Sequence, residues 1–347
     1  MNGHFKLTIY RKAIPLKEQQ TIQQFLSTHP HNTSFQSPEW FHFYLSLPNY
    51  KPLYFSITDE SGLVKAVMLA VIIAEGSGLM AFVSSRCVIY GGPIIDQDND
   101  VILATLLETL TRQMKSKAIF TQFRNFRYWN QSSVSIFEKH GYKLRDRLNL
   151  IVPLESADKV LSAFSASRRR QLKKALAARP EIRQAVSLKE VKDFYEMLHK
   201  LYKTRVKKPL PPLTFFDHFY EKLVPVGQGV ILLVFHQNQL IGGIICPLTP
   251  GHTIAELYVC GLDKAFPHLY PSVLATWAAL DYGIQHRIPE FDFMGLGKPE
   301  KAYGVRDFKL RFGGNQVNFG RFARRNNKTL YAIAEIGYNI LRSFQRI

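Results

Sequence analysis

The sequence predicts an α/β (α+β) protein of two tandem units, each a mixed, largely antiparallel sheet flanked by helices. Three observations support this fold class. The chain has 347 residues, which is long for a single hydrophobic core. Its 46% hydrophobic and 21% charged residues are typical of a globular protein. Finally, the same order of predicted elements (helix, strand pair, third strand, glycine, helix, strand) occurs twice along the chain.

The first half begins this order with an aromatic helix that follows Ser37-Pro38. Two strands are expected on either side of the polar turn Asp59–Gly62, and a third ends at Gly91-Gly92. Apolar residues at helical spacing then predict a helix, followed by another strand. The expected elements are a helix over 37–47, strands over 53–58, 64–74 and 86–90, a helix over 99–115 and a strand over 118–123.

The second half repeats the order. An aromatic helix precedes two apolar runs that the residues Gln237-Asn238-Gln239 separate, which predicts a hairpin. The next strand ends at Gly261, and an apolar helix and a short buried strand complete the unit. The expected elements are a helix over 213–223, strands over 230–236, 240–248 and 253–260, a helix over 272–286 and a strand over 290–294.

The domain boundaries expected from this repeat are 1–153 and 154–347. A basic linker helix should begin at Ser167 as N-cap and end at Pro180. An amphipathic helix is expected over 328–344. Its apolar side is expected to pack on the second unit, and contact with a membrane surface is the alternative.

The formal net charge is +18, and two segments carry most of it. The segment Arg168–Lys208 has 14 lysines and arginines against 4 acidic residues, and Lys301–Arg325 has 7 against 1. Clustered positive charge attracts polyanions such as tRNA or an anionic membrane face. The expected polyanion-binding residues are Arg168, Arg169, Arg170, Lys173 and Lys174, and a merely solvated helix face is the alternative reading.

Several other classes of site are not indicated. The three cysteines, Cys87, Cys246 and Cys260, are isolated, so neither a zinc site nor any other metal site is expected. Isolated cysteines fit a reducing cytoplasm. Residues 1–20 lack the apolar core of a signal peptide, and the longest apolar run, 66–74, is too short to span a bilayer. We therefore expect a cytoplasmic protein, either soluble or peripheral at the inner face of the cell membrane.

The most informative motif lies near the C-terminus. Phe291-Asp292-Phe293-Met294-Gly295 is followed by a second, basic-aromatic run that is expected to form a strand, Phe308-Lys309-Leu310-Arg311-Phe312-Gly313-Gly314. Cations beside a closely approachable backbone suit an anionic ligand or a developing oxyanion. These residues resemble the C-terminal signature of the Fem-type peptidoglycan-bridge aminoacyltransferases, which are tandem members of the GNAT acyltransferase superfamily. The resemblance covers about residues 167–322.

The resemblance implies a set of site residues. Lys309 matches the family lysine that follows a phenylalanine, here Phe308, and is the expected catalytic residue. Tyr258 matches a tyrosine that contacts the acceptor, and Arg205 lies near the place of an acceptor-phosphate contact, where Tyr202 or Lys203 would serve equally. Arg311 and Asp292 complete the expected substrate-binding set. The alternatives are an edge-strand lysine, a core tyrosine and a loop-capping aspartate.

The loops that bind acyl-CoA in most GNAT enzymes are not recognisable here. A phosphate cradle needs glycines before a helix, whereas Gly92–Asn99 is acidic and Leu262–Ser272 has no glycine. We therefore expect no tightly bound cofactor, an aminoacyl-tRNA co-substrate, and an amine on a cell-wall precursor as acceptor. The alternatives are transfer from acyl-CoA or an acyl carrier to a surface sugar or lipid, and a non-catalytic protein that binds RNA or anionic lipid.

Overall fold

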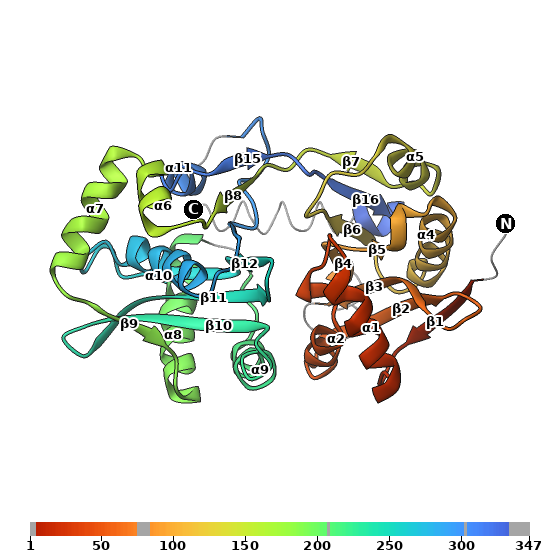
Figure 1. Cartoon of the computed structure of the whole chain (residues 1–347), viewed down its shortest axis with the longest axis horizontal. Coiled ribbons are helices and arrows are strands. Elements are labelled where there is room, and N and C mark those ends of the chain that lie inside the picture. The colour runs from red at the N-terminus through yellow and green to blue at the C-terminus, as the bar shows by residue number, and fades with distance from the viewer. Residues whose placement is uncertain (1–4, 75–83, 207–208, 302–303, 333–347) are drawn as a thin grey trace. The chain divides into compact units, whose positions relative to one another are not determined.

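The computed structural model describes residues 5–74, 84–206, 209–301 and 304–332 (Figure 1). It divides into two compact units. Unit 1 contains the chain up to Asp146 and from Phe319 onward, and unit 2 is Arg147–Asn318. Each unit is built on a mixed sheet of eight strands, which confirms the predicted fold class.

Unit 1 has the strand order β1-β2-β3-β4-β6-β16-β7, with β5 paired to β3. Neighbours are antiparallel except for the parallel pair β4 and β6. The strands are β1 (Lys6–Tyr10), β2 (Tyr50–Thr58), β3 (Val64–Ile73), β4 (Arg86–Tyr90), β5 (Ile94–Ile95), β6 (Phe120–Arg124), β7 (Lys143–Arg145) and β16 (Arg321–Arg325), and the α-helices are α1 (Leu16–Thr28), α2 (Pro38–Leu45), α4 (Asp100–Met114) and α5 (Gln131–Lys139).

Unit 2 has the strand order β15-β8-β14-β12-β11-β10-β9, with β13 paired to β11. Here β12 and β14 are the parallel pair. The strands are β8 (Asn149–Pro153), β9 (Glu181–Gln184), β10 (Gly229–His236), β11 (Gln239–Thr249), β12 (Thr253–Ala255), β13 (Tyr258–Gly261), β14 (Glu290–Asp292) and β15 (Asn315–Val317), and the helices are α6 (Ala157–Ala163), α7 (Ala166–Ala177), α8 (Leu188–Leu201), a π-helical turn (Tyr202–Val206), α9 (Leu213–Lys222), α10 (Pro271–Gln285) and α11 (Gly304–Leu310).

Most predicted elements lie where the local patterns place them. Ser37 caps α2 by accepting a hydrogen bond from the Trp40 N–H, as N-cap serines do. The β10–β11 hairpin turns at Gln237 and Asn238, which both have positive φ, as a tight turn between twisted strands requires. In both units the apolar face of a long helix, α4 or α10, packs in the same core as the sheet.

Three expectations differ from the structure. The basic-aromatic run does not form a strand: Phe308, Lys309 and Leu310 are the last residues of helix α11, and Phe312 follows in a turn, with its ring packed on that of Phe308. The strand expected over 253–260 is divided into β12 and β13. Helix α7 is capped by Ser165 and not by Ser167. Of the helix expected over 328–344, only Lys328–Ala332 lies within the described residues, and it is helical there.

The units also differ from the expected boundaries of 1–153 and 154–347. Strand β8 pairs with β14 and β15, so residues 149–153 complete the sheet of unit 2. Strand β16 lies between β6 and β7, so the chain returns to unit 1 after Asn318. Because this pairing joins segments almost two hundred residues apart, no local pattern could indicate it.

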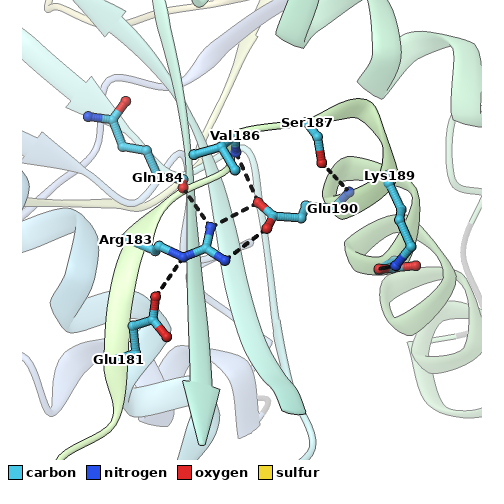
Figure 2. A network of polar contacts seen from close by, with 8 residues as sticks. Glu181, Arg183, Gln184, Val186, Ser187, Lys189 and Glu190 are labelled. Atoms are coloured by element: carbon cyan, nitrogen blue, oxygen red, sulfur yellow. Dashed lines mark hydrogen bonds and ion pairs between the residues drawn. The ribbon is translucent and has the colours of Figure 1, made fainter. Parts of the chain in front are cut away.

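An ion-pair network anchors the start of α8 beside the edge strand β9 (Figure 2). Arg183 donates two hydrogen bonds to the Glu190 carboxylate, at 2.9 and 2.8 Å, and one to Glu181 at 2.7 Å. Glu190 also accepts from the Val186 N–H, while Ser187 accepts from the Glu190 N–H. Because Arg183 pairs with it, the pKa of Glu190 is lowered. The network thus joins the first turn of α8 to strand β9.

Candidate active site where strands β12 and β14 part

Unit 2 contains a point where two parallel strands separate. Strands β12 and β14 pair as far as Ala255 and Asp292, and the Glu256 N–H donates to the Asp292 carbonyl at 2.8 Å. From there β13 continues alongside β11, whereas Phe293 donates its N–H to Leu150 of β8. Carboxyl ends of neighbouring parallel strands are a common location for functional side chains.

The chain after β14 turns sharply. Met294 has a φ of 56° and Gly295 a φ of 133°. Asp292 holds this turn, because its Oδ1 accepts from the Met294 N–H at 2.5 Å and from Asn149 Nδ2 at 2.7 Å. Burial raises the pKa of Asp292 to about 6, while the hydrogen bonds from Asn149 and Met294 act in the opposite direction. Asp292 therefore lies at the predicted place and stabilises the turn there.

Lys309 extends from α11 into this turn and is only 8% exposed. Its Nζ donates to the carbonyl oxygens of Phe293 at 2.7 Å and Gly295 at 3.2 Å. It also forms an ion pair with Glu256, with Nζ 2.8 Å from Oε1. An ammonium group has three N–H donors, so these three oxygens use all of them. Lys309 thus joins α11, the β14 turn and the β12–β13 break.

Glu256 is the acidic partner in this site, and sequence reasoning missed it. It occupies the break between β12 and β13 and is 6% exposed. Its Oε1 faces Lys309, whereas its Oε2 is buried with no hydrogen-bond partner among the described residues. The one signal in the sequence was an acidic residue inside an otherwise apolar strand-like run.

Two tyrosines lie beside this pair. Tyr258 is the first residue of β13, with its ring 5.5 Å from Phe216 and 6.1 Å from Tyr202. Tyr202 ends α8 and begins the π-helical turn. Burial raises the pKa of Tyr202 to about 12, and the nearby Glu256 and Cys260 add to this effect. The structure thus places Tyr202 near Glu256, with Tyr258 beside Tyr202, while Lys309 pairs with the carboxylate.

Phe308, which precedes Lys309 in α11, packs against Arg168. The Arg168 guanidinium lies 4.4 Å from the Phe308 ring centre and 4.3 Å from that of Phe312, and it donates to the Phe308 carbonyl. Arg168 is 2% exposed, and burial lowers its pKa to about 10, with Arg311 acting in the same direction. Arg168 is therefore a core side chain and does not fit the expected polyanion-binding surface.

The remaining predicted residues lie outside the cluster. Arg205 is exposed on the π-helical turn, and Arg311 is exposed at the end of α11. The basic side chains of α7 that do reach the surface are Arg169, Arg170, Lys173 and Lys174. Arg169 donates to the carbonyls of Ser162 and Phe164.

Both helix N-termini where a GNAT phosphate cradle is expected are closed by the chain itself. In α10, Pro271 has no N–H, Asp263 accepts from the Ser272 N–H at 3.0 Å, and Val273 and Leu274 donate to Tyr270. In α4 the Asn99 side chain accepts from Val101 and Ile102. The first-turn N–H groups of α10 are therefore already bonded, and its entrance carries a carboxylate.

Neither a metal site nor a membrane span is found among the described residues. No group of three or more His, Cys, Asp or Glu side chains is arranged to hold a metal ion in the part of the chain that the structure describes. Within the same ranges, no helix has both the length and the apolar character needed to cross a bilayer.

Comparison with known proteins agrees with this architecture. Residues 162–309 match the family model described as an acetyltransferase (GNAT) domain. The structure of FemX is similar, with a TM-score of 0.72 at 16% identity over 94% of this chain and 99% of that one. No curated protein matches the chain by sequence.

Two further solved structures are similar to most of this chain. A tandem GNAT protein from the clavulanic acid biosynthesis pathway has a TM-score of 0.56 at 9% identity, covering 92% of this chain and 99% of its own. L-PGS from Bacillus licheniformis has a TM-score of 0.57 at 12% identity, covering 94% and 97%. Residues 162–309 thus match a GNAT acetyltransferase domain, and the chain has the fold of FemX and of the tandem GNAT protein.

Proposed function

We propose that unit 2 transfers an aminoacyl group from aminoacyl-tRNA to an amine of a cell-wall precursor. The main support for this proposal is the N-terminus of α10, where the first-turn N–H groups are already bonded within the chain. In an acyl-CoA enzyme the N–H groups of such a helix bind the pyrophosphate, but here Asp263 and Tyr270 accept from them. A carboxylate at that position would also repel a pyrophosphate.

The remaining support comes from the site and from the fold. Lys309, Phe308, Asp292 and Tyr258 match the Fem-type signature, and three of them, Lys309, Asp292 and Tyr258, gather where β12 and β14 part. In the reaction, the acceptor nitrogen attacks the ester carbonyl carbon, a C–N bond forms, and the C–O bond to the tRNA ribose breaks. The ribose oxygen leaves as a hydroxyl after taking up a proton, and the nitrogen loses one. Holding both substrates together would supply much of the acceleration.

Where the reaction occurs is part of the same proposal. The exposed cations of α7 would attract tRNA or the anionic inner face of the cell membrane, where lipid-linked cell-wall precursors are presented. The enzyme would then work in the cytoplasm as a soluble or peripheral protein.

Transfer from acyl-CoA is the second candidate, and the match of residues 162–309 to an acetyltransferase family favours it. The decisive experiment offers the purified full chain a muramyl-pentapeptide precursor with either tRNA charged with labelled amino acids or labelled acetyl-CoA. We expect a labelled amide product from charged tRNA only, with deacylated tRNA plus free amino acids as control. Product from acetyl-CoA alone would reverse the assignment. Tight binding of tRNA without product from either donor would instead indicate a binding protein.

A further inference from the structure

Glu256 has one carboxylate oxygen without a hydrogen-bond partner among the described residues. Its Oε1 faces Lys309 at 2.8 Å, whereas Oε2 is buried and accepts no hydrogen bond from the described residues. Leaving a buried polar atom without a partner costs about 1–3 kcal/mol, and more for a charged group. Such an uncompensated cost is usual at functional sites, where a ligand supplies the missing bond.

Lys309 cannot itself supply a donor to a reacting group in this arrangement. Its three N–H bonds are directed to Glu256, Phe293 and Gly295. The carbonyl oxygens of Phe293 and Gly295 hold the Lys309 ammonium in place, and the ammonium in turn holds the Glu256 carboxylate. The pair therefore leaves an acceptor oxygen, and not a cation, without a partner at the break between β12 and β13.

The surroundings point to a ligand that carries N–H donors. Glu256 lies at the break between β12 and β13, at the point where β12 and its parallel neighbour β14 part. Tyr202 lies close to it, and the Tyr202 hydroxyl makes no hydrogen bond with any described residue. A carboxylate oxygen and a nearby phenol hydroxyl can together hold an amine, since the first accepts its N–H and the second can donate or accept.

We propose that Glu256, held in place by Lys309, binds the acceptor amine and takes up the proton that the nitrogen loses. This inference rests on the proposed acyl transfer and names the residue that contacts the nucleophile. As the C–N bond forms, one N–H proton passes to Glu256 Oε2. When the bond from the carbonyl carbon to the donor oxygen breaks, that proton is returned to the leaving oxygen, which restores the carboxylate. Lys309 is then a positioning residue for Glu256.

A binding measurement tests the contact without requiring any acyl donor. Protein labelled with ¹³C at the glutamate side-chain carboxyl is titrated with n-butylamine, and with n-butanol as the matched compound without the cation. The Glu256 signal is identified by its loss in Glu256→Gln, or in Glu256→Asp if the first variant does not fold. We expect n-butylamine to shift this signal in a saturable way and n-butanol not to do so. No shift, or equal shifts with both, would overturn the proposal even if the chain proves to be an acyltransferase.

A kinetic measurement tests the role in transfer once a donor and acceptor are known. Glu256→Gln should lower kcat/KM by about 100-fold, the usual contribution of a positioned proton acceptor. Glu155→Gln is the matched control, because Glu155 forms an exposed ion pair with Lys159. Retention of wild-type kcat/KM by Glu256→Gln would refute a catalytic role. An NMR shift without any detectable transfer would leave the amine site standing and count against the proposed function alone.

Discussion

The buried ion pair between Lys309 and Glu256 predicts a large loss of stability when the lysine alone is removed. Lys309→Met keeps an apolar stem of similar length but leaves the Glu256 charge buried without its cation, and it also leaves the carbonyls of Phe293 and Gly295 without a donor. Breaking a buried pair in this way typically costs about 3–5 kcal/mol. We expect a loss of this size in the free energy of unfolding of unit 2.

The double variant Lys309→Met/Glu256→Gln separates the charge effect from the packing effect. Because it removes both charges, it should recover a large part of the loss, with a coupling energy of about 2 kcal/mol or more between the two sites. Lys298→Met is the matched control, because Lys298 is half-exposed and its ion pair with Glu300 is 3.5 Å long, a kind worth about 0–1 kcal/mol.

Hydrogen exchange followed by mass spectrometry is the suitable assay, because it reports each unit separately. Peptides from β10 and β11 give the stability of unit 2, and peptides from β2 and β3 give that of unit 1. Protection should fall in unit 2 of Lys309→Met while unit 1 is unchanged. A loss of less than about 1 kcal/mol in unit 2, or a double variant no more stable than Lys309→Met, would show that Lys309 and Glu256 are not an interdependent buried pair.

Three further predictions concern the acceptor, pH and polyanions. Tyr258→Phe should raise KM for the acceptor at an unchanged melting temperature; a lower melting temperature at constant KM would mean a structural hydroxyl instead. The folded-state pKa of Asp292, about 6, lies above the ordinary 3.8, so the folded protein holds this proton more tightly than the unfolded chain does. The contribution of Asp292 to the free energy of unfolding is therefore complete below pH 3.8 and is lost as pH rises through 6. Asp292→Asn should abolish this fall in the free energy of unfolding, which amounts to up to about 3 kcal/mol, in urea titrations between pH 4 and 7. The control Asp307→Asn, at an exposed position, should retain the fall. Reversing Arg170, Lys173 and Lys174 to glutamate should reduce the salt dependence of tRNA binding by about 0.7 in slope per lost contact; an unchanged slope would mean a solvated face.

The sequence predicted the elements whose signals are local. Ser37 before Pro38, the turn at Gln237-Asn238 and the apolar spacing of α4 and α10 each act within a few residues. These signals repeat in both halves, and their agreement was sufficient to predict two similar units.

The features that sequence reasoning missed depend on distant partners. Arg168 belongs to a run of three arginines and was expected to face solvent, yet its guanidinium packs on Phe308 of α11 and on Phe312, which follows that helix. Likewise, Glu256 is a functional candidate only because Lys309 meets it across the turn that follows β14. A charge pattern read along the chain cannot reveal which cation or carboxylate will be buried by a segment that folds back much later.

The return of β16 to unit 1 affects how the chain can fold during its synthesis. Phe322 of β16 is fully buried and stacks on Phe137, with ring centres 3.9 Å apart and planes 6° from parallel. The ribosome makes this strand only after the whole of unit 2. Until then, the sheet of unit 1 lacks the strand that lies between β6 and β7. Unit 2 is thus the first unit that can be completed, although it is second in the sequence, and nascent unit 1 exposes an open strand edge of the kind that favours mispairing. A premature stop just after unit 2 would therefore damage the unit that was synthesised first.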